Sequence, residues 1–153
     1  MISSVKRGLM AALFVAVAFG AASNTATAQD RLSGLFINLT TDDTWSAAKA
    51  VFFAQRAMSQ GIEPVVIWMN VRAVYLAMAD RPSDVPGALR DADQSLHDML
   101  QAFMDNGGVV IMCQACSHTA GLTLDDYIDG VVMGNWAMVS GYLFDPMVQT
   151  LAW

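Results

Sequence analysis

The sequence predicts an α/β fold: a three-layer α/β/α domain with a mostly parallel sheet of about five strands. Two observations lead to this prediction. Short apolar runs rich in valine and isoleucine alternate along the chain with segments whose apolar residues recur at helical spacing. Several runs are apolar at nearly every position, as expected for strands whose two faces are both covered.

Five segments fit strands of such a sheet. They share an apolar run bounded by turn-forming or polar residues. The predicted strands are residues 35–39, 65–69, 109–112, 131–133 and 148–153.

Three longer segments fit helices, and each carries a start or stop signal. The predicted helices cover about residues 45–60, 91–105 and 135–143. Asp43 or Thr44 can cap the first helix, and Gly61 ends it. Asn106 ends the second helix, and Pro146 follows the end of the third.

Residues 70–90 are less regular than the rest of the domain. Pro82, Pro86 and Gly87 interrupt any helical pattern there. We therefore expect a loop, with one helical turn near residues 74–78. Loops of this length often border functional sites.

Residues 1–28 fit a cleavable secretory signal peptide. Two basic residues precede an apolar stretch at residues 9–22, and Ala26-Thr27-Ala28 fits a signal-peptidase site. The stretch is too short for a spanning helix, which needs about 20 apolar residues. The sequence therefore predicts export to a bacterial periplasm. Residues 29–153 then form a single domain with no membrane attachment after cleavage.

The mature domain is acidic and carries few charges. Cleavage removes two of the eight basic residues and none of the fourteen acidic ones, leaving a net charge near −8. This charge disfavours nucleic acid and anionic membrane surfaces as partners. Trp136, Tyr142 and Trp153 add large apolar side chains to a small domain. We therefore expect a homo-oligomer whose interface uses the C-terminal third and shelters the Cys113 loop.

Cys113 and Cys116 are the two cysteines of the protein, and Cys113 directly follows the apolar run at residues 109–112. A thiol at the end of a parallel strand lies at the edge where α/β folds place their sites. Such a C-x-x-C pair can form a reversible disulfide, hold a persulfide or bind a soft metal ion. A disulfide across so short a loop adds little stability, so the spacing favours reversible chemistry.

His118 lies two residues after Cys116 and could act as a base, stabilise a thiolate or complete a soft metal site. With the two cysteines it supplies fewer ligands than a zinc site takes, so we expect no metal. The sequence contains no phosphate-binding loop, dinucleotide motif or hydrolase nucleophile motif, and we expect no cofactor. His97 is expected on the exposed side of the second helix.

The pattern from the first strand to the C-terminus resembles the DsrE/DsrF-like family of small sulfur-relay proteins. Members begin with a strand, a polar loop and an alanine-rich helix that ends in glycine. Residues 35–39, residues 47–50 and Gly61 are similar to this arrangement. In the sulfur-carrying members a cysteine ends the third strand and a glycine follows eight residues later. Cys113 and Gly121 match these two positions.

The resemblance implies a persulfide on Cys113, a homo-oligomer such as a trimer or hexamer, and a sulfur carrier rather than a turnover enzyme. Its partner would be a sulfur donor or acceptor protein, or a small sulfur species. Cys116 is expected to be the partner thiol that releases the sulfur. Two alternatives use the same pair: a thiol-disulfide oxidoreductase or redox sensor, and a soft-metal-binding module. The export signal and the second thiol distinguish this sequence from the cytoplasmic members of the family.

Overall fold

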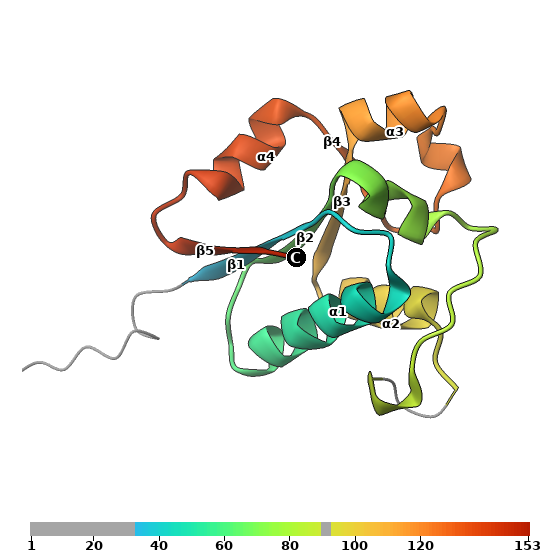
Figure 1. Ribbon diagram of the computed structural model, residues 1–153. Helices are drawn as coiled ribbons and strands as arrows, with labels where there is room; N and C mark the ends of the chain where they lie inside the picture. Colours follow the sequence, from blue (N-terminus) through green and yellow to red (C-terminus); the bar gives the residue numbers. More distant parts are fainter. Residues whose placement is uncertain (1–32, 90–92) are drawn as a thin grey trace, which may run out of the picture.

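A computed structural model of the chain describes residues 33–89 and 93–153. The predicted signal peptide at residues 1–28 lies outside the described residues. Within them the chain forms a five-stranded sheet in which all neighbouring strands are parallel (Figure 1). The predicted α/β fold with a mostly parallel sheet of about five strands is confirmed.

The strand order across the sheet is β4-β3-β2-β1-β5. The strands are β1 (Gly34–Leu39), β2 (Val65–Met69), β3 (Val109–Cys113), β4 (Val132–Gly134) and β5 (Val148–Ala152). Leu39 pairs with Met69, and Met69 pairs with Met112. The carboxyl ends of β1, β2 and β3 are therefore level with one another at one edge of the sheet.

Helices connect the strands. The described residues form the α-helices α1 (Thr44–Ser59), α2 (Leu96–Asp105), α3 (Gln114–Ala120) and α4 (Trp136–Leu143), and the 3-10 helices η2 (Val71–Ala77), η3 (Gly87–Leu89) and η4 (Leu124–Asp126). None of the helices in this described part has the length and apolar character needed to cross a membrane.

The helices cover the two faces of the sheet unequally, as Figure 1 shows. From β1 to β4 the chain moves in one direction across the sheet, and then it returns past β1 to form β5. Because β-α-β crossovers are right-handed, this reversal places α4 on the face opposite α1 and α2. The larger core lies under α1 and α2, and the smaller core, around Phe36 and Val139, lies under α4.

The second helix starts later than the pattern predicted. We expected a helix from residue 91, but α2 begins at Leu96. Ser95 accepts the backbone N–H of Asp98, and the Asp98 carboxylate accepts the backbone N–H of Ser95. This reciprocal capping box satisfies the free donors of the first turn and sets the start of the helix.

Residues 70–90 are more regular than expected. One helical turn was predicted near residues 74–78, whereas η2 covers seven residues, Val71–Ala77. Ala73, Val74 and Leu76 are buried, and these apolar contacts hold the segment against the carboxyl ends of the strands.

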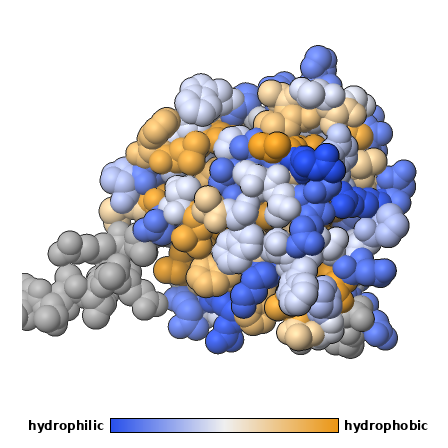
Figure 2. Space-filling view, in the orientation of Figure 1, coloured by the Kyte–Doolittle hydropathy of each residue, from blue (hydrophilic) through white to orange (hydrophobic). Residues whose placement is uncertain are grey.

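The large aromatic residues of the C-terminal third have different environments. Tyr142 stacks on Phe36 with ring centroids 5.9 Å apart, and Trp153 packs on Phe53 at 6.0 Å. Trp136 remains 67% exposed on α4. Figure 2 shows hydrophobic residues gathered at the upper left, over the α4 part of the molecule.

Candidate functional site

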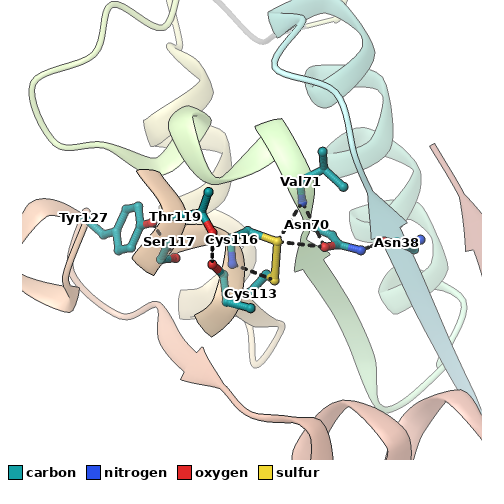
Figure 3. The surroundings of a disulfide bond; sticks show 9 residues. Asn38, Asn70, Val71, Cys113, Cys116, Ser117, Thr119 and Tyr127 are labelled. Atoms are coloured by element: carbon teal, nitrogen blue, oxygen red, sulfur yellow. Dashed lines mark hydrogen bonds between the residues drawn. A yellow bond between two sulfur atoms is a disulfide. The ribbon is translucent and has the colours of Figure 1, made fainter. Parts of the chain in front are cut away.

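The two cysteines lie at the carboxyl edge of the sheet, beside the ends of β1 and β2 (Figure 3). Cys113 is the last residue of β3, Asn70 directly follows β2, and Asn38 is the penultimate residue of β1. Carboxyl ends of parallel strands form the common site edge of α/β folds. The topology therefore brings Cys116 next to Asn70, although they are 46 residues apart in sequence.

Cys113 joins β3 to α3 and is only 8% exposed. Its Sγ accepts a hydrogen bond from the backbone N–H of Cys116 at 3.3 Å. This is the position at which an N-cap side chain satisfies a free donor of the first helical turn. The Cα atoms of the two cysteines are 5.2 Å apart, and their sulfur atoms form a disulfide.

Cys116 is half-buried in the first turn of α3 and contacts the loop after β2. The backbone N–H of Val71 donates to Cys116 Sγ at 3.2 Å, and Asn70 Oδ1 lies 3.1 Å from the same sulfur. A thiol at Cys116 can donate to this oxygen, while a thiolate is stabilised by the Val71 N–H. Each sulfur of the pair thus accepts one backbone N–H.

Asn70 holds this arrangement in place. Its Oδ1 accepts the backbone N–H of Val71 at 2.9 Å, and its Nδ2 donates to Asn38 Oδ1 at 3.3 Å. These two bonds orient the amide so that its oxygen faces Cys116. The sequence analysis missed Asn70 and Asn38. The available signal was an asparagine at or beside the carboxyl end of each of two neighbouring predicted strands.

Val71 has a strained backbone. It is 56% exposed and adopts a φ of 52°, in the left-handed region. A β-branched residue is rarely found there, because its side chain collides with the backbone. Such strain gathers at functional sites, where surrounding contacts hold it. Here those contacts are the hydrogen bonds to Asn70 and Cys116.

A hollow of about 340 Å³ opens beside Cys116. Its walls come from η2 and α3, and its lining residues are Val71, Arg72, Tyr75, Ala115, Cys116, Thr119 and Ala120. Arg72 is the one charged residue among these described lining residues. Cys113 does not line the hollow, so Cys116 is the sulfur that faces it.

Arg72 is held by its neighbours at the mouth of the site. Its Nη2 donates to Asp42 Oδ2 at 2.6 Å, and its guanidinium lies 5.6 Å from the centre of the Tyr75 ring. The hydrogen bond from Arg72 lowers the pKa of Asp42 below its ordinary value. Arg81 donates to the backbone carbonyl of Asp42 at 2.9 Å. The loop before α1 is therefore tied to the segment that carries the hollow.

The far side of α3 is fixed by a buried hydrogen bond. Tyr127 donates from its hydroxyl to Ser117 Oγ at 2.7 Å, and both residues are buried. Burial raises the pKa of Tyr127 above its ordinary value, so the hydroxyl stays protonated and remains a donor. This bond anchors the helix whose first turn carries Cys116.

The two histidines lie apart from the cysteine pair. His118 is exposed on α3, and within the described residues its imidazole makes no hydrogen bond. Residues two apart on a helix face different directions, so His118 points away from Cys116. Its role as a base stays a prediction. His97 was expected at the surface; instead it is half-buried and its Nε2 lies 3.0 Å from the carbonyl oxygen of Leu76.

No group of three or more His, Cys, Asp and Glu residues in the described ranges could hold a metal ion. A hollow of about 470 Å³ lies at the opposite edge of the sheet, near the start of β2. Its lining includes Gln55, Glu63 and Asn106 but neither sulfur. This hollow therefore lies away from the cysteine pair.

No family model matches the sequence, and no curated protein matches it. Solved structures do have a similar fold. The YchN protein from E. coli has a TM-score of 0.62 at 14% identity, covering 80% of this chain and 100% of that chain. A protein of unknown function from Methanobacterium thermoautotrophicum, MTH1491, has a TM-score of 0.54 at 14% identity, covering 77% and 96%. The present chain therefore shares its α/β fold with these two proteins.

Proposed function

We propose that this protein handles sulfane sulfur in the bacterial periplasm, holding it as a persulfide on Cys113 with Cys116 as the partner thiol. The observation that supports this most directly is a pair of adjacent sulfurs at the carboxyl edge of a DsrE-like fold. Each sulfur accepts one backbone N–H, which favours the thiolate that sulfur transfer requires.

The low exposure of Cys113, 8%, suits it to hold a persulfide. Exposed persulfides are lost to oxidants, and the packing around Cys113 limits that access. Cys116 supplies a way to release the sulfur. Its thiolate attacks the inner sulfur of the Cys113 persulfide, the Cys113–Cys116 disulfide forms, and hydrosulfide leaves with the electron pair of the broken bond.

The proposed compartment and partners rest on the sequence. The predicted signal peptide supports export, and the acidic mature domain supports a small sulfur species or a sulfur-carrying protein as partner rather than nucleic acid. Cell fractionation with N-terminal sequencing tests the compartment. We expect a periplasmic protein that begins at Gln29, and a cytoplasmic protein that retains its first residues contradicts the proposal.

Intact-mass measurement after incubation with inorganic polysulfide tests the chemistry. We expect the dithiol form of the mature protein to gain sulfur, and the variant with both cysteines changed to serine to gain none. Once loaded, Cys116→Ser, which lacks the releasing thiol, should hold its adduct, and Cys113→Ser should keep less than about a tenth of that adduct over the same time, because the sheltered position is lost. No gain on the wild type, or an equally long-lived adduct on Cys113→Ser, would falsify the proposal.

The disulfide itself favours a second candidate function, thiol-disulfide exchange. Equilibration of the protein in glutathione redox buffers distinguishes the two. A pair that exchanges with thiols at a potential above about −300 mV but takes up no sulfur supports this second function. A potential far below that value indicates a static bridge and argues against both functions.

A further inference from the structure

We infer that Cys116 is the sulfur that meets the incoming donor, that the hollow beside it holds the organic part of a small, negatively charged persulfide, and that Cys113 then receives the sulfur from Cys116. This inference rests on the proposed function. It adds the entry point, the order of the two cysteines and the class of donor.

Access separates the two sulfurs. The backbone hydrogen bonds do not, because Cys113 Sγ and Cys116 Sγ each accept one backbone N–H, at 3.3 Å and 3.2 Å; Cys116 Sγ alone also lies 3.1 Å from Asn70 Oδ1. Cys113 is 8% exposed and does not line the hollow, whereas Cys116 is half-buried and forms part of its wall. Since attack between sulfurs depends on access, an incoming donor reaches Cys116 first.

The hollow indicates what the donor looks like. Its volume of about 340 Å³ lies at the lower end of the range for small-molecule sites. It is much larger than one sulfur atom needs, so it can hold the carbon skeleton of a thiol. Val71, Ala115 and Ala120 give it apolar walls. Arg72 donates to Asp42 through Nη2, and its exposed guanidinium has further N–H donors that suit an acidic group on the donor.

The first step is a transfer to Cys116 in the dithiol form. The Cys116 thiolate attacks the outer sulfur of a persulfide, R–S–SH. A bond forms between Cys116 Sγ and that sulfur, the S–S bond of the donor breaks, and RS⁻ leaves with the electron pair. The product is a Cys116 persulfide, and no electrons are gained or lost overall.

The second step moves the sulfur within the pair. The Cys113 thiolate attacks the outer sulfur of the Cys116 persulfide, and Cys116 is released as a thiolate. The two side chains are already within bonding distance of one another, with Cα atoms 5.2 Å apart. The sulfur thus passes from the position that faces the hollow to the position that is buried.

Single-cysteine variants test this order, with glutathione persulfide as the donor and intact mass as the readout. Cys113→Ser, which keeps Cys116, should take up sulfur initially at the wild-type rate. Cys116→Ser, which keeps Cys113, should be at least about tenfold slower. As a measurement that needs no variant, rapid quenching of the wild type followed by tandem mass spectrometry should find the sulfur on Cys116 before Cys113.

The charge of the donor is tested with cysteamine persulfide, which lacks a carboxylate. Arg72→Gln should lower the preference for glutathione persulfide over cysteamine persulfide by about threefold or more. Arg56→Gln, an exposed residue in the last turn of α1, serves as the control and should leave the ratio unchanged.

The outcomes separate this inference from the function on which it rests. A wild type that takes up sulfur first on Cys113, or a Cys116→Ser variant as fast as Cys113→Ser, overturns the order while the proposed function stands. An unchanged donor preference in Arg72→Gln overturns the assignment of the hollow. A wild type that takes up no sulfur from any donor overturns the proposed function and this inference together.

Discussion

Val71 donates its backbone N–H to Cys116 Sγ at 3.2 Å, from a backbone whose φ is 52°. The same turn of the chain brings Asn70 Oδ1 to 3.1 Å from that sulfur. The strained loop after β2 thus presents one donor and one acceptor to the half-buried cysteine. Cys116 is thereby supported in both protonation states, because the thiol uses the acceptor and the thiolate uses the donor.

Replacing Val71 with glycine should increase stability. Left-handed backbone costs an L-residue roughly 1–2 kcal/mol, and glycine adopts it without that strain. Glycine loses roughly 0.5–1 kcal/mol through backbone entropy, so the net gain in unfolding free energy should be up to about 1.5 kcal/mol. Urea denaturation measures it. Val132→Gly, in the regular strand β4, should instead lose stability, and equal losses at the two positions contradict the assignment of strain to Val71.

A negative charge at Asn70 should suppress the reactivity of Cys116. Asn70→Asp places a carboxylate where the amide oxygen now lies, 3.1 Å from the sulfur, and disfavours the thiolate. In a Cys113→Ser background, alkylation by iodoacetamide at neutral pH should slow by about tenfold, with its pH profile moved upward. Asn135→Asp, at the start of α4, is the control. If the pH profile of Cys116 alkylation does not shift in Asn70→Asp, the amide of Asn70 does not contact the Cys116 sulfur.

Gly134 should tolerate no side chain. It pairs with Cys113 across β3 and β4, and a Cβ there would lie 2.1 Å from Cγ2 of the buried Ile111. Gly134→Ala should therefore lower the unfolding free energy by about 1–3 kcal/mol. Gly87→Ala, whose Cβ would meet nothing within 4 Å, should leave it nearly unchanged. Similar denaturation midpoints for the two variants contradict the close approach of β4 to β3.

Stability should fall at acid pH because helix starts depend on ionised aspartates. The pKa of Asp98 is lowered by its hydrogen bonds with Ser95, and the pKa of Asp126 is lowered by its hydrogen bonds with Thr123. A pKa below the unfolded value of 3.8 means that the stabilisation is present above that pH and is lost as pH falls through the folded-state values.

Thermal unfolding from pH 7 to pH 2 checks this dependence. At pH 7, Asp98→Asn should have a lower melting temperature than the wild type. On acidification, its melting temperature should fall by less than that of the wild type. Asp129→Asn is the control, since Asp129 makes no hydrogen bond within the described ranges. A wild-type melting temperature that stays constant to pH 2 contradicts the prediction.

The predicted homo-oligomer can be tested at α4. Trp136 and Phe144 are 67% and 73% exposed, with ring centroids 6.1 Å apart, and they form an apolar pair on the thinly covered side of the sheet. Burial of such a pair by a second copy would stabilise association. Light scattering should show an oligomer for the mature wild type and a smaller species for Trp136→Glu. Trp45 on α1 is 63% exposed and serves as the control: Trp45→Glu should form an oligomer of the same molar mass as the wild type. A wild-type monomer at micromolar concentration refutes the prediction.

The sequence by itself determined the strands, most helix ends and the closeness of the two cysteines. Each depends on residues close together in the chain. The apolar run at residues 109–112 predicts a buried strand, and Asp43 caps α1 through Ser46, three residues later. Cys113 and Cys116 approach because the chain turns from β3 directly into α3. The late start of α2 could also have been predicted from the sequence, because the two residues of its capping box, Ser95 and Asp98, are close together in the chain.

Only the tertiary structure decided what surrounds that pair. Asn38 and Asn70 are 32 residues apart, and they meet because β1 and β2 are neighbours in a defined register. The strained φ at Val71 and the difference in access between the sulfurs likewise arise where η2 packs against α3. A local pattern reports propensity and periodicity, whereas these features follow from which strands pair and at which residues, and that pairing is set by the burial of the whole core.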